Sequence, residues 1–351
     1  MSTLRWTPFT AASQHDKTLG LEPPPVRKGR LTRLMALFSW WLLSKVEGRT
    51  PSTASATITT HLGELIQGEF TVRNGIIRGL ITLPCPTFTA TATATIYPGG
   101  SGVVVTPCWA SKAAKAGAMT LNYLDARNVG VHIRLHSDIP MEIGAGSSTG
   151  DVVASIEATA KALGSPLPSA VVGHLTVETE GASDPTMHRD GLVRLFAQRV
   201  GLDIEVLDAS LPPLEVVSIA DGAGVNTNAY PPAKYSADDG VEFDALLARM
   251  RRAVAAGDAT EIGAIATRSA QINQKFLPKP HFRKWLSFAT AFGSVGIAVS
   301  HSGSAVSFLF DGLAPDAAHK GDVLAAALKD DGFEIIARFN TAHLQSEGEN
   351  A

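Results

Sequence analysis

The chain has 351 residues, more than one hydrophobic core usually holds, so two lobes are expected. It carries 30 lysines and arginines against 33 aspartates and glutamates, a net charge of −3. No basic stripe interleaved with aromatic residues is present, which argues against a nucleic-acid partner and favours a small molecule. The only cysteines, Cys85 and Cys108, form no Cys-x-x-Cys motif, which excludes a zinc finger, a thioredoxin-type site and a disulfide scaffold.

The first fifty residues superficially resemble a signal peptide, because basic side chains at positions 27–33 precede an apolar run at 34–43. The run is too short to span a bilayer, and Lys45, Glu47 and Arg49 interrupt the path to a cleavage site. We interpret residues 1–52 as an N-terminal extension that is poorly ordered or peripheral to the fold. A basic amphipathic helix at residues 27–45 that contacts a membrane surface is the alternative.

Residues 57–106 are rich in predicted strands, which glycine and proline separate. The strands are expected at residues 57–60, 70–72, 76–83, 87–96 and 103–105. The run at 89–96 alternates threonine and alanine, as a strand with one small apolar face does. We assign this run to packing and not to function.

The rest of the chain mixes helices and strands. Helical spacing predicts helices at residues 110–126, 151–163, 168–179, 243–256, 259–276 and 315–329. Apolar runs predict strands at 131–135, 214–219, 296–300, 305–310 and 332–339. Because this order lacks regular β-α alternation, it favours an α+β chain over a doubly wound sheet.

The most informative segment lies at residues 140–151, between an apolar strand pattern and a predicted helix. Its three glycines permit backbone torsions that bring N–H groups toward a ligand, and its hydroxyl residues lie where a helix begins with unpaired donors. A phosphate is the natural ligand of such a loop. The spacing fits neither the Walker A pattern nor the dinucleotide fingerprint, so another class of phosphate loop is indicated.

This loop resembles the central motif of the GHMP small-molecule kinases, in which proline precedes Gly-x-Gly-Ser-Ser at the start of a long helix. The continuation at residues 147–151 resembles the Ser-Ser-Thr-x-Asp form of the L-threonine kinase branch, which serves cobalamin side-chain synthesis. Residues 61–68 resemble the N-terminal Gly-Glu-Leu-x-Gln-Gly signature of that branch. Residues 296–304 resemble the glycine-rich C-terminal motif of the superfamily.

The resemblance implies an α+β, two-lobe GHMP fold with the active site between the lobes. The N-terminal ATP-binding lobe is expected at residues 53–211, a ferredoxin-like C-terminal lobe at 212–340 and a tail at 341–351. It also implies ATP and Mg²⁺ as cofactors, a small hydroxyl amino acid as substrate and, because ATP is required, a cytoplasmic location. L-threonine, converted to O-phospho-L-threonine, is the expected substrate.

The nucleotide phosphates are expected to bind the central loop, whose matching residues are Pro140, Gly144, Ala145, Gly146, Ser147, Ser148 and Thr149. Magnesium takes few protein oxygens beside water and phosphate, so Ser148 with Glu180 is the expected metal site. Glu178 is the alternative ligand, because Glu180 lies one position further from the Asp-x-Thr segment than the family glutamate does. The serines could instead merely cap the helix.

Phosphoryl transfer needs a group that receives the hydroxyl proton, and Asp184 resembles the aspartate of the Asp-Ser-Thr segment of the threonine kinases. An Asp-Pro turn cap would look the same in sequence. For the substrate, Glu64 could pair with an ammonium group and Gln67 could hydrogen-bond a carboxylate, on an expected strand-to-turn segment. The C-terminal motif residues His301, Ser302 and Gly303 are expected to close the site near the substrate.

Three alternatives to a threonine kinase stay open. Another hydroxyl compound, such as homoserine or a polyol, could be the substrate, because substrate choice depends on side chains that the sequence does not position. The superfamily also hosts ATP-dependent decarboxylases. A non-catalytic nucleotide-binding sensor is the third alternative, against which the aspartate at position 184 argues.

Overall fold

The computed structural model describes residues 51–222, 233–301 and 303–344, all within one compact unit that spans Val46–Ala351. The expectations for residues 1–50, including the membrane-contacting helix at 27–45, lie outside the described residues, as do Ser302 and most of the tail. No helix of the described part has the length and apolar character needed to cross a bilayer.

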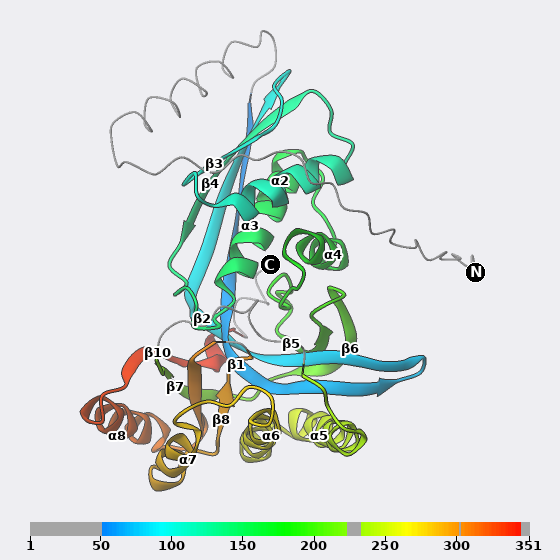
Figure 1. The fold of residues 1–351 in the computed structure, drawn as a ribbon. Helices are drawn as coiled ribbons and strands as arrows, with labels where there is room; N and C mark the ends of the chain where they lie inside the picture. Colours follow the sequence, from blue (N-terminus) through cyan, green and yellow to red (C-terminus); the bar gives the residue numbers. More distant parts are fainter. Residues whose placement is uncertain (1–50, 223–232, 302, 345–351) are drawn as a thin grey trace. The chain divides into compact units, whose positions relative to one another are not determined.

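The described strands form one ten-stranded sheet, in the order β10-β7-β9-β8-β1-β2-β4-β3, with β5 paired to β2 and to β6 (Figure 1). Two long strands dominate it. Their bounds and those of the others are β1 Ser52–Val72, β2 Gly75–Pro98, β3 Val103–Thr106, β4 Val129–Ser137, β5 Leu192–Ala197, β6 Leu202–Ser210, β7 Leu214–Ala220, β8 Gly296–Val299, β9 Ala305–Asp311 and β10 Glu334–Asn340.

The helices fall into two groups (Figure 1). Beside the upper halves of the long strands lie α2 Ser111–Tyr123, α3 Ser147–Ala162 and α4 Ser169–Glu180. A row below the sheet consists of α5 Ala237–Ala256, α6 Ala259–Asn273, α7 Phe282–Ala291 and α8 Ala317–Asp330, and the short 3-10 helix η2 follows at Thr341–Leu344. The α+β class is confirmed, while the lobe limits 53–211 and 212–340 stay a prediction.

Besides the short η2, two strands and one α-helix were not predicted from the sequence: β5, β6 and α7. Helix α7 contains aromatic residues and threonine, which have modest helix propensity, but it packs Phe282 and Trp285 into the C-terminal core. Trp285 is only 1% exposed. Tertiary packing therefore decides this helix, which local spacing does not reveal.

The alternating run at residues 89–96 forms the strand that its pattern predicts. Ala90, Ala92 and Ala94 are fully buried, while the hydroxyls of Thr91 and Thr93 pair across the ladder with β1 hydroxyls, each at 2.9 Å. Helix α3 packs on this small apolar surface. The alanines thus let α3, and the loop that opens it, approach the sheet closely.

The centre of β1 departs from a regular strand. The sequence suggested a strand-to-turn segment at Glu64 and Gln67, but β1 runs through both, and its pairing with β2 shifts register between His61 and Glu64 and again between Glu64 and Ile66. Gly63 lies between these positions with φ +94°, where a Cβ atom would lie 2.9 Å from the Ala298 backbone. Only glycine meets both the torsion and the close approach to β8.

The predicted phosphate loop is fixed from the C-terminal side of the chain. Ala305 donates its backbone N–H to the Ile143 carbonyl at 2.9 Å, and the Ser300 hydroxyl donates to the Gly144 carbonyl at 3.2 Å. The loop is thereby held against the β8–β9 turn, far away in sequence.

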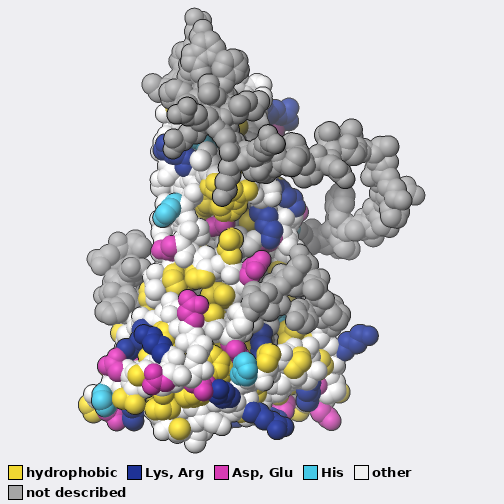
Figure 2. Space-filling model, turned by 60° about the vertical axis from the view of Figure 1, so that its left-hand side comes forward, with side chains coloured by type: hydrophobic (Ala, Val, Ile, Leu, Met, Phe, Trp, Pro, Cys, Tyr) yellow, Lys and Arg dark blue, Asp and Glu magenta, His cyan; other side chains and the backbone are white. Residues whose placement is uncertain are grey.

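The surface carries charges of both signs. On the face that Figure 2 shows, acidic and basic side chains are mixed over the lower part of the molecule, and no large area of a single sign is visible there. This distribution gives no support to a nucleic-acid interface.

We predict that Gly63→Ala destabilises the protein by about 2 kcal/mol or more, because alanine must adopt a left-handed torsion and its Cβ collides with β8. Urea unfolding measures this change. Gly240→Ala is the matched control, since Gly240 lies in α5 with open space around an added Cβ, and a gain of up to about 1 kcal/mol is expected there. Equal loss in both variants would contradict the role of the bulge.

Candidate active site

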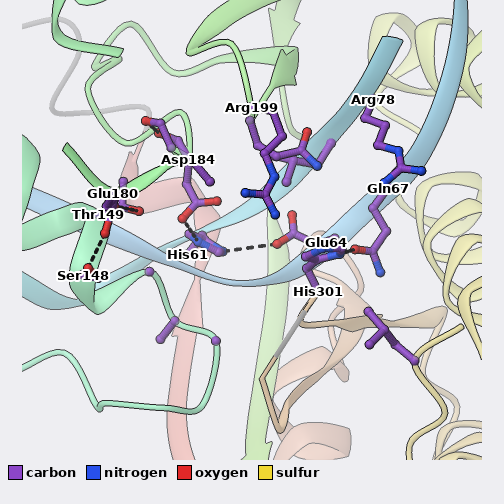
Figure 3. Close-up of a pocket in the computed structure, with 18 of the residues that line it drawn as sticks. His61, Glu64, Gln67, Arg78, Ser148, Thr149, Glu180, Asp184, Arg199 and His301 are labelled. Atoms are coloured by element: carbon purple, nitrogen blue, oxygen red, sulfur yellow. Dashed lines mark hydrogen bonds and ion pairs between the residues drawn. The ribbon is translucent and has the colours of Figure 1, made fainter. Parts of the chain in front are cut away.

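A cavity of about 340 Å³ lies between the predicted phosphate loop, the centre of β1 and the β8–β9 turn. Figure 3 shows its layout: Ser148, Thr149 and Glu180 lie at one end, Glu64, Gln67 and His301 at the other. His61 and Asp184 lie between the two ends. The lining includes acidic and basic side chains from widely separated parts of the sequence.

The phosphate end begins where α3 begins. The N-cap residue is Gly146, which provides no side-chain hydrogen bond, so the first N–H groups of α3 have no capping side chain. The Ser148 and Thr149 hydroxyls donate to the Glu180 carboxylate instead, Thr149 at 2.9 Å. The simple capping interpretation of these residues is therefore wrong, and the free N–H groups with the helix dipole suit an anionic ligand.

Lys112, from the first turn of α2, adds a cation to this end. Its Nζ lies 2.6 Å from the Ser148 Oγ and 2.9 Å from the Glu180 Oε2. The Glu180 carboxylate and the Ser148 hydroxyl thus both lie against the Lys112 ammonium, a positive charge. This donor pair fits Mg²⁺, which binds hard oxygens and fills its remaining positions with water and phosphate.

The two candidate glutamates of α4 point to different surroundings. Glu180 lines the cavity and its side chain is only 6% exposed. Glu178 pairs with His174 at 3.4 Å on the surface, with 46% of its side chain exposed. The structure therefore favours Glu180 over Glu178 as a ligand for a cation bound beside the phosphate loop.

Asp184 and His61 form a close pair in the middle of the cavity (Figure 3). The His61 Nε2 lies 3.2 Å from the Asp184 Oδ2, and His61 Nδ1 lies 3.7 Å from the Glu64 Oε1. Burial alone would lower the pKa of His61, but Asp184 and then Glu64 outweigh it and raise the pKa to about 9. Burial would raise the pKa of Asp184, yet the His61 imidazolium holds it below its usual range.

The other end of the cavity carries Gln67 and His301. Burial lowers the pKa of His301 to about 4, so the ring is neutral, and its Nδ1 contacts the Gln67 Oε1. In this arrangement Nδ1–H donates to the amide oxygen. Because the amide oxygen accepts from His301, the two N–H groups of the Gln67 amide are left to donate to a ligand oxygen.

Two guanidinium groups also line the cavity. Arg78 donates to Glu69 Oε1 at 2.9 Å and to the Ala233 carbonyl, so it is already engaged. Arg199 donates one N–H to the Gly181 carbonyl at 3.1 Å, and within the described residues it forms no ion pair. Arg199 can therefore bind a carboxylate or phosphate that enters the cavity.

Comparisons with known proteins agree with this layout. The model of the GHMP kinases N terminal domain matches residues 110–188, and the model of the GHMP kinases C terminal matches residues 250–332. The chain belongs to the GHMP kinase superfamily. The GHMP kinases are phosphotransferases with alcohol acceptors, so the chain belongs to a family of enzymes.

Two curated relatives of this GHMP kinase are named L-threonine kinase. One from Salmonella typhimurium is 26% identical over 184 residues, covering 52% of this chain and 60% of the relative. The other, from Citrobacter freundii, is 27% identical over 186 residues, covering 52% of this chain and 62% of the relative. The matches thus span about three fifths of the length of these relatives.

The solved structures confirm the GHMP kinase fold. Homoserine kinase from Cytophaga hutchinsonii superimposes with a TM-score of 0.61 at 16% identity, covering 84% of this chain and 96% of that protein.

Most of the predicted site residues of this GHMP kinase line the one cavity. The residues that do so are Glu64, Gln67, Gly144, Ala145, Gly146, Ser147, Ser148, Thr149, Glu180, Asp184 and His301. Pro140 and Gly303 are not among the described lining residues, and Gly303 instead lies against the backbone of Ile143. Ser302 lies outside the described residues.

Among the cavity residues that sequence reasoning missed are three with basic side chains, His61, Lys112 and Arg199. His61 belongs to the recognised segment 61–68, yet three positions separate it from Glu64, and a regular strand would place the two on opposite faces. Lys112 and Arg199 match no motif. Only their places in the fold bring them to the site.

We predict that the His61 imidazole titrates near pH 9, and that Asp184→Asn lowers its pKa by roughly one pH unit or more. NMR titration of the histidine ring carbons, with His61→Asn to assign the signal, measures this. Because the folded state binds this proton more tightly, the stabilisation is complete below about pH 6.5 and is lost as the pH rises through about 9.

Asp208→Asn is the control for that titration, because Asp208 is exposed on β6 and does not line the cavity. It should leave the His61 signal unchanged. If the His61 pKa in Asp184→Asn equals that of the wild type, then Asp184 does not raise the pKa of His61.

Proposed function

We propose that this chain transfers the γ-phosphoryl group of ATP to the side-chain hydroxyl of a small amino acid, with L-threonine as the substrate. The observation that carries the proposal is the order of groups along one cavity. A helix N-terminus with Lys112 lies at one end, the Asp184 carboxylate in the middle, and Glu64 with Gln67 at the other end. These are the groups that a phosphate, a hydroxyl and an amino acid head group need, in that order.

The residues divide the work of the reaction between them. The N–H groups at the start of α3 and the Lys112 ammonium stabilise the charge on the nucleotide phosphates. Asp184, held ionised by His61, accepts the proton of the attacking hydroxyl. The new bond joins the substrate oxygen to the γ-phosphorus, the bond from that phosphorus to the β,γ-bridging oxygen breaks, and ADP leaves with the electron pair.

Ser148 and Glu180 are the residues that we propose to hold Mg²⁺. The ion would neutralise charge on the transferring phosphate. Lys112, which is 54% exposed and contacts both oxygens, has the freedom to move toward the phosphates when a cation occupies this place.

The substrate end supports an amino acid. Glu64 offers a carboxylate for an ammonium group, and the Gln67 amide nitrogen and the free N–H groups of Arg199 offer donors to a carboxylate. The names of the two curated relatives support L-threonine among the amino acids, and cobalamin side-chain synthesis as the pathway. A cytoplasmic location belongs to the same proposal, because ATP is available there.

The first test is a product assay of the full chain with Mg-ATP. L-threonine should give ADP and O-phospho-L-threonine, identified by mass, faster than L-serine, L-homoserine or a polyol. A phosphorylated homoserine as the main product would replace threonine within the same proposal. ATP binding without turnover of any of these compounds would favour the sensor alternative.

We predict that Asp184→Asn lowers kcat for the favoured substrate by about 100-fold or more, because the amide cannot accept the hydroxyl proton. Asp208→Asn, with the same chemical change on the surface, should keep full activity. A kcat equal to that of the wild type would remove Asp184 from the role of base.

We predict that Glu180→Gln raises the Mg²⁺ concentration needed for half-maximal activity by roughly tenfold, because a neutral amide binds a hard cation less well than a carboxylate does. Glu178→Gln is the matched control, from the same helix but facing the surface. Activity measured against total Mg²⁺ distinguishes the two. A shift in Glu178→Gln alone would assign the metal to the other glutamate.

A further inference from the structure

Glu64 is a carboxyl group with unusual surroundings. Its side chain is only 2% exposed, and its Oε2 is buried with no hydrogen-bond partner within the described part of the chain. It nevertheless lines the ligand cavity (Figure 3). An ionised carboxylate left in this state would be costly, because neither water nor a full set of donors compensates its charge.

The nearest cation does not fully compensate Glu64. His61 lies 3.7 Å from Glu64 but only 3.2 Å from Asp184, so a single imidazolium faces two acids. Of the other cations that line the cavity, Arg78 is paired with Glu69, and Arg199 forms no ion pair with Glu64 within the described residues. In the free protein the second acid is therefore most stable with a proton.

We propose that Glu64 selects ligands with an ammonium group, and that it does so by giving up its proton to solvent as the cation of the ligand enters the cavity. The ammonium group then replaces the missing cation beside the buried carboxylate. This inference rests on the proposed function for the choice of L-threonine as ligand. It adds that the cavity distinguishes an amino acid from a hydroxy acid of the same shape.

The electrostatics agree with this exchange. Burial raises the pKa of Glu64 to about 8, His61 opposes the rise, and Asp184 adds to it. At neutral pH the free protein therefore holds this proton, and a bound ammonium lowers the pKa and releases it. The release should approach one proton per ligand well below pH 8, fall as the pH rises through about 8, and vanish when Glu64 is already ionised.

Isothermal calorimetry of the full chain at pH 7, in two buffers with different heats of ionisation, measures the protons released per ligand. We expect close to one for L-threonine and for L-threoninol, which keeps the ammonium but lacks the carboxylate. We expect none for 3-hydroxybutyrate, which lacks the ammonium and should bind about 100-fold more weakly. Glu64→Gln should abolish the release and weaken L-threonine binding by at least about tenfold, whereas Glu178→Gln should retain both.

The outcomes separate this inference from the proposed function. The inference would be overturned, and the function left standing, if L-threonine is phosphorylated but its binding releases no proton. An unchanged release on binding in Glu64→Gln would have the same meaning. Release with L-threoninol while L-threonine neither binds nor reacts would uphold the inference and remove L-threonine as substrate. Equal binding of L-threonine and 3-hydroxybutyrate would show that Glu64 does not select the ammonium.

Discussion

The irregular centre of β1 is the constraint on which the site depends. In a regular strand, side chains three positions apart point to opposite faces of the sheet, so His61, Glu64 and Gln67 would not share one cavity. Two register shifts, the first of which contains Gly63 in a left-handed torsion, bring all three to the same side. Gly146 completes the arrangement, because a Cβ atom there would lie 2.8 Å from the His61 Nε2. The phosphate loop and the bulge therefore fit together only with glycine at position 146.

Charge is distributed along the cavity in a way that matches its geometry. The phosphate end combines a helix N-terminus with a lysine, while the middle holds the pair of Asp184 and His61. Glu64, neutral His301 and the amide of Gln67 form the far end, which offers one carboxyl group and hydrogen-bonding groups. A phosphate, a reacting hydroxyl and an amino acid head group would each meet complementary groups along the cavity.

The site belongs to no single part of the chain. The phosphate loop of the N-terminal region accepts hydrogen bonds from Ala305 and Ser300, which flank the β8–β9 turn of the C-terminal region. Strand β1 pairs with β8 at Glu64 itself, opposite Val299. The position of the Glu64 carboxylate is thus coupled to the C-terminal strands. Changes in either region should reach both the nucleotide end and the substrate end.

The amino-acid sequence alone determined those features that depend on residues close together in the chain. Glycine and hydroxyl residues before a helical pattern identified the phosphate loop, the alternation at 89–96 identified a half-buried strand, and three motifs in order identified the family. The sequence also named two candidates for a metal ligand, Glu178 and Glu180, which lie two positions apart and so on different sides of α4. Which of them faces the cavity was decided by how α4 packs.

Tertiary structure alone decided the rest, because the deciding contacts join residues distant in sequence or depend on a broken period. The convergence of His61 and Glu64 requires a bulge that strand periodicity does not predict, and the contact of Lys112 with Ser148 and Glu180 requires α2, α3 and α4 to meet. Arg199 follows a strand that the sequence pattern did not reveal. The buried charges of the cavity take their protonation states from these contacts, and no local pattern of residues records them.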